Sequence, residues 1–175
     1  PTTGDRTVSS FSHEEEEAVP GYYKVRLADD DIVAELSATA RTGIHRYTYP
    51  AGSQRNLWID LDHSANKGSW DRRIINAPIR QTAPDRIEGY RVITGWAKLR
   101  KVYFAVEFSE PIAAMSLYDG DGRKYTGKDA TVINGRSPRA LISFGDASRP
   151  VTGKVALSGV SVANARENLV KEAQA

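Results

Sequence analysis

The sequence predicts an all-β fold, an antiparallel β-sandwich of many short strands with a helix at the C-terminal end. Apolar residues alternate with polar ones at every second position through much of the chain, and Gly, Pro, Asn or Asp separates most of the alternating segments. The 175 residues are 40% hydrophobic and 26% charged, which is typical of one soluble domain. We therefore assign residues 1–160 to one sandwich domain.

The first two predicted strands form a hairpin. Tyr23, Val25 and Leu27 share one face of the segment 21–27, and Lys24 and Arg26 take the other face. Three aspartates at 29–31 interrupt this pattern as a turn, and the alternation resumes over 32–38. A turn this short between two such segments favours antiparallel pairing.

Seven further strands are predicted along the rest of the chain. The clearest is 102–108, in which Val102, Phe104, Val106 and Phe108 face the same way. The other strands are 44–49, which Pro50 ends, 57–61, 87–96, 113–118, 140–144 and 155–160.

The last segment, 161–175, is the only one with the pattern of a helix. Ser161 is a suitable N-cap, and the apolar residues that follow are spaced by three and four positions. This apolar stripe consists of Val162, Ala165, Leu169 and Ala173.

Composition excludes several classes of function. The chain has no cysteine, so a disulfide scaffold, a thiolate zinc site, an iron–sulfur cluster and a thiol nucleophile are excluded. The net charge of +2 is spread along the chain, which argues against a nucleic-acid partner, and no apolar run is long enough for a membrane span. Because translation starts at Met and this chain starts at Pro1, we expect a processed or excised piece.

The most chemically suggestive segment is the run from Ser12 to Glu17, in which His13 precedes four glutamates. An imidazole beside carboxylates can hold a metal ion or act as a general acid/base group. A run of adjacent acids is, however, more typical of a solvated loop, because like charges repel unless a cation lies among them. Both interpretations stay open at this point.

Three weaker motifs have structural interpretations. The segment 119–122 begins like a calcium loop, but Arg123 and Ala130 occupy two ligand positions, so a hairpin turn is predicted. On their strands, only His45 with Tyr47, or Asp60 with Asp62, can converge, and the residues at 62–63 can equally close a turn. The tryptophans could stack on sugars, but burial in a core or an interface is the more common fate for Trp58, Trp70 and Trp96.

Several segments, taken in order, resemble the N-terminal domain of glycoside hydrolase family 92, the bacterial exo-acting α-mannosidases. The resemblance covers nearly the whole chain. The segments are PTTGD at 1–5, FSHE at 11–14, PGYY at 20–23, AELSAT at 34–39, GIHRYTYP at 43–50, IDL at 59–61, GYR at 89–91, GWA at 95–97, VYF at 102–104, EFS at 107–109, VSV at 160–162, NAR at 164–166 and NL at 168–169.

The resemblance implies a two-domain enzyme in which a β-sandwich packs on a catalytic (α/α)6 barrel. The barrel would supply the catalytic acid and base and a calcium ion, and would cleave terminal α-mannosides, such as α-1,2-linked mannose of N-glycans, with inversion. Residues 161–175 would lead to that barrel, and part of the sandwich would precede Pro1. The parent enzyme would be periplasmic, secreted or on the cell surface.

On this resemblance, the chain itself contains no catalytic residue and no metal ligand, and we expect it to be inactive alone. Ser12, His13 and Glu14 match the most recognisable loop of the domain, and are candidates for contact with the substrate or the barrel. The alternative function is a stand-alone carbohydrate-binding β-sandwich module without catalytic activity.

Overall fold

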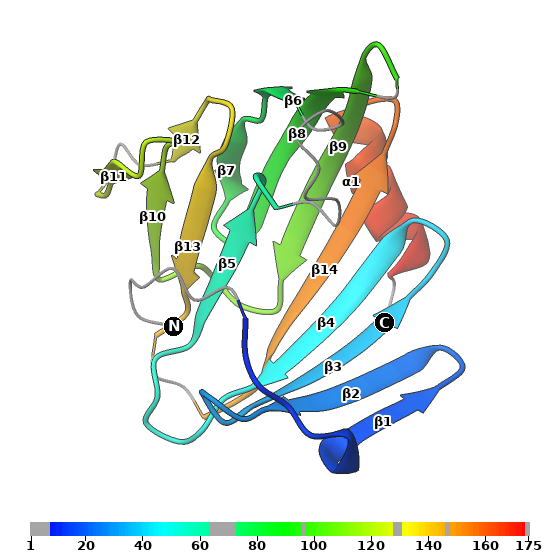
Figure 1. Cartoon of the computed structure of the whole chain (residues 1–175), viewed down its shortest axis with the longest axis vertical. Coiled ribbons are helices and arrows are strands. Elements are labelled where there is room, and N and C mark those ends of the chain that lie inside the picture. The colour runs from blue at the N-terminus through cyan, green and yellow to red at the C-terminus, as the bar shows by residue number, and fades with distance from the viewer. Residues whose placement is uncertain (1–7, 64–72, 96, 128–130, 146–147, 174–175) are drawn as a thin grey trace.

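The computed structural model describes residues 8–63, 73–95, 97–127, 131–145 and 148–173, and confirms the all-β class with one C-terminal helix (Figure 1). In these residues the larger sheet has ten strands in the order β1-β2-β3-β4-β14-β9-β8-β7-β12, with β6 also pairing to β8. Its strands are β1 (Glu16–Val19), β2 (Tyr22–Leu27), β3 (Ile32–Ala38), β4 (Thr42–Thr48), β6 (Arg73–Asn76), β7 (Ile79–Ala83), β8 (Arg86–Thr94), β9 (Arg100–Phe108), β12 (Val132–Ile133) and β14 (Val151–Ser158).

The smaller sheet has four strands in the described residues, in the order β11-β10-β13-β5. They are β5 (Asn56–Asp60), β10 (Ala114–Tyr118), β11 (Lys124–Tyr125) and β13 (Arg139–Ser143). Figure 1 shows this sheet stacked on one part of the larger sheet, while β1 to β4 extend beyond it. The sandwich is therefore asymmetric, with much of the larger sheet outside the overlap.

The core lies between the two sheets, where the alternating apolar residues of both meet. Phe108 and Phe144 pack edge to face with ring centroids 4.9 Å apart, and join β9 to the end of β13. The buried residues of this core are Ile79, Ile87, Phe104, Val106, Phe108, Leu117, Ile133, Ala140, Ile142, Phe144 and Val151.

Helix α1 (Val162–Glu172) covers the opposite face of the larger sheet. Ser161 is its N-cap as predicted, because its Oγ accepts a hydrogen bond of 3.1 Å from the Asn164 N–H. The predicted apolar stripe faces the sheet, and Ala165 and Leu169 pack against two small residues of β9 and β14. Alanines at Ala105 and Ala156 let the helix approach the strands closely.

Strand β14 begins four residues earlier than the sequence pattern predicts. Gly153 interrupts the alternation of apolar residues in the sequence, but in the structure it pairs with Phe108 of β9. A Cβ on Gly153 would lie 3.3 Å from the Phe108 ring. The glycine therefore makes room for the ring from across the strand pair, which a local pattern does not reveal.

One buried ion pair connects segments that are far apart in the chain. Arg55, before β5, donates two hydrogen bonds to the Glu110 carboxylate, and both side chains are almost fully buried, with 2% and 6% exposed. Arg55 also donates to the carbonyls of Phe144, at 2.6 Å, and Gly145, at 2.9 Å. Arg149, before β14, donates to the second Glu110 oxygen at 3.0 Å. The cluster joins the start of β5 to the ends of β9 and β13.

Candidate functional site

The residues predicted as site candidates lie at the outer edge of the larger sheet. His13 and Glu14 are in a short 3-10 helix, η1 (His13–Glu15), which leads into edge strand β1. Ser12 is the N-cap of that helix, and its Oγ accepts a hydrogen bond of 3.2 Å from the Glu14 N–H. All three residues are exposed, with 87% of the His13 side chain accessible, so this loop is available for contacts with a ligand or another domain.

The structure brings His13 together with Glu16 rather than with Glu14. His13 Nδ1 lies 2.6 Å from Glu16 Oε2, and the Tyr23 hydroxyl donates to the other Glu16 oxygen at 2.6 Å. The hydrogen bonds from Tyr23 and then from His13 lower the pKa of Glu16 below its ordinary value. Glu16 is therefore a fixed carboxylate that orients the imidazole. Glu16 and Glu17 belong to β1, so the acidic run is partly an edge strand, where charges discourage pairing with other chains.

The described residues contain no group of three or more His, Asp or Glu side chains that could hold a metal ion. At the segment that begins like a calcium loop, Asp119 Oδ1 accepts hydrogen bonds from the N–H groups of Asp121 and Arg123. Its Oδ2 accepts from the Tyr125 hydroxyl at 2.9 Å. Donors thus surround this carboxylate in place of a cation, and the predicted hairpin turn between β10 and β11 is confirmed.

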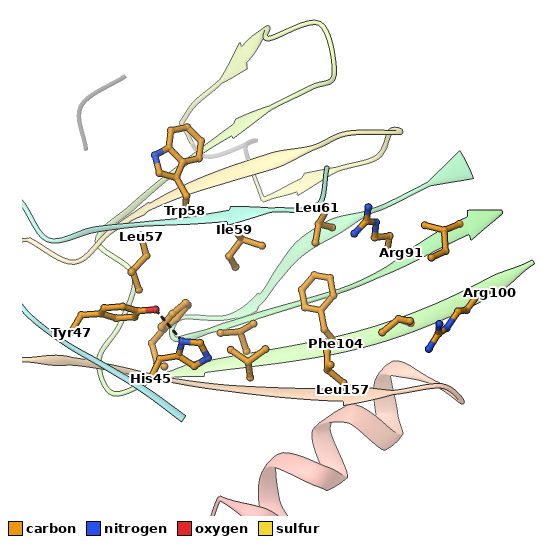
Figure 2. Close-up of a pocket in the computed structure, with 16 residues that line it drawn as sticks. His45, Tyr47, Leu57, Trp58, Ile59, Leu61, Arg91, Arg100, Phe104 and Leu157 are labelled. Atoms are coloured by element: carbon orange, nitrogen blue, oxygen red, sulfur yellow. Dashed lines mark hydrogen bonds between the residues drawn. The ribbon is translucent and has the colours of Figure 1, made fainter. Parts of the chain in front are cut away.

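A second candidate site is a pocket of about 510 Å³ between the two sheets (Figure 2). Its volume lies within the range of small-molecule sites, roughly 300–1,000 Å³. Leu57, Ile59 and Leu61 reach into it from β5 and the residue after it, and apolar side chains of β9 and β14 form the opposite wall. Polar side chains stand at its ends, His45 and Tyr47 at one and Arg91 and Arg100 at the other.

His45 and Tyr47 converge as their strand positions predict. The Tyr47 hydroxyl lies 3.0 Å from His45 Nδ1, and both side chains line the pocket. Burial lowers the pKa of His45 below its ordinary value of 6.5 and raises that of Tyr47. Both groups are therefore neutral near pH 7, which suits a hydrogen-bonding pair at the end of an apolar pocket.

The neutral His45 makes stability depend on pH in a defined window. The unfolded chain binds a proton at this residue near pH 6.5, whereas the folded chain does so only at lower pH, so stability falls as the pH drops below about 6.5. We expect His45→Gln to reduce this loss in urea unfolding between pH 7 and pH 5. Tyr47→Phe is the control, because it leaves the imidazole desolvated and should keep the wild-type slope. An unchanged slope in His45→Gln would contradict the assignment.

The other motifs have structural roles where the structure describes them. Trp58 also contributes to the lining of the pocket, but its ring points to the other face of β5, 5.2 Å from that of Tyr118 and with the Arg139 guanidinium 5.7 Å from its centroid. Asp60 closes a turn, because its Oδ1 accepts hydrogen bonds from the N–H groups of Asp62 and His63. Trp70 and Trp96 lie outside the described residues.

Sequence reasoning missed the pocket and the buried Arg55–Glu110 pair. Each pocket residue carries an ordinary strand signal, and nothing local distinguishes a side chain in a filled core from one beside a cavity. Arg55 stands between two polar residues, Gln54 and Asn56, which is also the pattern of an exposed loop.

Comparison with known proteins identifies relatives of the chain. Its sequence matches the glycosyl hydrolase family 92 N-terminal domain over residues 1–158. The structure of the family GH92 α-mannosidase BT3965 from Bacteroides thetaiotaomicron is similar, with a TM-score of 0.83 and 30% identity over 95% of this chain. The GH92 glycosyl hydrolase ccman5 gives a TM-score of 0.75 and 30% identity over 92% of it. No curated protein sequence matches the chain.

The inverting mannosidase BT2199 of the same bacterium has the same fold, with a TM-score of 0.75 at 22% identity. The chain spans only 23% of the length of BT3965 and 22% of that of ccman5. Among the described residues, α1 is too short and too polar to cross a membrane, and no other helix would do so.

Proposed function

Because this chain belongs to the family of N-terminal domains of glycoside hydrolase family 92, we propose that it is the non-catalytic sandwich of a longer α-mannosidase. The observation that carries the proposal is the match over residues 1–158, which includes the strands of both sheets and ends at Ser158, the last residue of β14, before the helix begins at Val162. Relatives with 30% identity are glycoside hydrolases of which the chain covers less than a quarter, in keeping with one part of a larger enzyme.

In the parent enzyme the sandwich packs on the catalytic (α/α)6 barrel and helps to shape the entrance for mannose-containing glycans. The exposed loop with Ser12, His13 and Glu14 is our candidate for the contact with substrate or barrel, because Glu16 holds the imidazole in a fixed orientation at an accessible edge. The parent works in the periplasm, on the cell surface or after secretion, in keeping with glycan substrates.

We assign the chemistry to residues outside the part of the chain that the structure describes. Hydrolysis with inversion needs one carboxylic acid to protonate the leaving oxygen and a separate carboxylate to activate water across the sugar ring. Among the described residues, no carboxylate lines the pocket. Its polar lining residues are His45, Tyr47, Arg91 and Arg100, and the rest of its lining is largely apolar. The resemblance to family 92 supports a calcium ion bound by the barrel, and we propose that location for it.

The decisive test compares the parent polypeptide with the 175-residue chain on α-mannosides. We expect the parent, supplied with calcium, to release mannose from mannose-rich glycans, and the 175-residue chain to release none. Inversion predicts that β-mannose is the first product detected by NMR. A β-mannoside is the matched control substrate. A parent polypeptide that released no mannose from any α-mannoside would overturn the proposal.

The alternative function, a stand-alone carbohydrate-binding module, needs an exposed aromatic platform. The Trp58 ring lies against Tyr118 and Arg139, so part of its surface is already covered. Titration of the 175-residue chain with mannose oligosaccharides discriminates the two functions. We expect no measurable affinity, whereas retained affinity would favour the module.

A further inference from the structure

Among the described residues, no strand pairs with the outer edge of β5, which lies beside the pocket. Hydrogen bonds from Leu61 N–H to the Pro138 carbonyl and from Phe144 N–H to the Arg55 carbonyl show that odd-numbered residues of β5 bond to β13. Backbone groups of successive residues in an antiparallel strand point to opposite sides. The N–H and C=O groups of Trp58 and Asp60 therefore point away from β13, and the described residues place no strand there.

The larger sheet continues beneath this free edge with an apolar face. The register places His45 of β4, Gly153 of β14 and Phe108 of β9 side by side on the face that lines the pocket. Leu157 belongs to the same face, yet 48% of its surface is exposed. Within the described residues, the smaller sheet thus ends at β5 before it has covered the apolar surface that lies opposite it.

The free edge of β5 and the uncovered apolar face of the larger sheet lie next to each other. An added strand would pair with the edge and cover the face at the same time. We propose that an extended segment of the parent polypeptide, outside these 175 residues, pairs with β5 as a fifth strand of the smaller sheet and fills the pocket. This inference rests on the proposed function, since the solved relatives have more than three quarters of their length outside the matched region. A small apolar ligand would fill the pocket but would leave the backbone groups of Trp58 and Asp60 unpaired.

The surroundings define the chemistry of this segment. Leu57 and Ile59 point into the pocket, and strand alternation puts Trp58 and Asp60 on the outer face of β5. The added segment should therefore also alternate apolar and polar side chains. About five residues match the length of β5, from Asn56 to Asp60. The polar side chains at the two ends of the pocket, Tyr47 and Arg100 among them, suit the ends of such a strand, where its backbone leaves the sandwich.

Amide hydrogen exchange tests the pairing directly. In the 175-residue chain, the N–H groups of Trp58 and Asp60 should exchange rapidly, whereas those of Leu57 and Ile59 are protected by β13 and act as internal controls. In the parent polypeptide, the exchange of Trp58 and Asp60 should slow by about 100-fold or more, as for a paired strand. Equal exchange of these two amides in both proteins would overturn the proposal.

A pair of matched variants tests the covering of the pocket. Leu157 lines the pocket and Leu99, which is 58% exposed, does not. Leu157→Asp should lower the melting temperature of the parent polypeptide more than that of the 175-residue chain, because only the parent buries this position. Leu99→Asp should have similar effects in both proteins. Equal losses for Leu157→Asp in the two proteins would contradict the proposal.

Other occupants give different results in the same measurements. In one such outcome, Leu157→Asp destabilises the parent more than the 175-residue chain, but the amides of Trp58 and Asp60 exchange equally fast in both. That result would mean that a surface of the barrel, rather than a strand, covers the pocket, and it would overturn the proposal. Protection that appears in the 175-residue chain as its concentration rises, together with a dimer in sedimentation, would mean a second copy and would also overturn it. Mannose release by the same polypeptide is scored separately, so failure of the function and failure of the strand pairing are distinguished.

Discussion

Glu110→Ala should lower the free energy of unfolding by about 3–5 kcal/mol, the largest single effect that the structure predicts. The change removes the only carboxylate that contacts the Arg55 guanidinium among the described residues, and leaves a cation that is 98% buried without its counter-charge. Desolvation of an unpaired charge, rather than the loss of the ion pair itself, causes the loss. Urea unfolding at pH 7, followed by circular dichroism, measures it.

Two further variants separate this mechanism from simple loss of packing. Arg55→Met combined with Glu110→Ala should recover part of the stability, because no charge is then buried. Glu15→Ala is the matched control, since Glu15 pairs with Arg26 where both side chains are at least 40% exposed, and it should change stability little. A double variant less stable than Glu110→Ala alone would contradict the buried-charge explanation.

The same carboxylate has a defined pH signature. Hydrogen bonds from Arg55, and then from Arg149, lower the pKa of Glu110 below its ordinary value of 4.5. The folded chain therefore binds this proton at lower pH than the unfolded chain does. The stabilisation is complete above about pH 4.5 and is lost as the pH falls through the lowered value, so Glu110→Gln should show a shallower acid-induced loss than the wild type.

Gly89→Ala should lower the free energy of unfolding by about 3 kcal/mol through overpacking. Gly89 lies in the middle of β8, and a Cβ there would meet the Pro78 carbonyl oxygen at 2.1 Å and the Phe104 ring at 2.6 Å. The carbonyl belongs to the backbone and cannot rotate away as a side chain can. Thermal or urea unfolding measures the loss.

Gly135→Ala is the matched control for Gly89→Ala. A Cβ on Gly135 would have no neighbour within 4 Å, and its backbone does not adopt the left-handed region. This change should be neutral or slightly stabilising, because it restricts the unfolded chain without disturbing the folded one. A loss at Gly135 as large as that at Gly89 would contradict the steric explanation.

Local signals in the sequence predicted much of the fold. The alternation over 102–108 predicted β9, the cap and stripe from Ser161 predicted α1, and the aspartates at 29–31 predicted the turn between β2 and β3. Strands β1, β6, β7, β11 and β12 escaped prediction, because segments of two to five residues carry little periodicity. The His45–Tyr47 contact was predictable, since residues two apart on a strand share a face.

The sequence by itself determined the all-β class, the terminal helix and the resemblance to family 92, because alternation, capping and ordered motifs are properties of neighbouring residues. Only the tertiary structure decided which glycines make room for rings, which arginine is buried, and where the smaller sheet ends. These features arise between residues far apart in the chain, such as Arg55 with Glu110 and Gly153 with Phe108. The pocket at the β5 edge is of this kind, because it depends on how far one sheet extends over another.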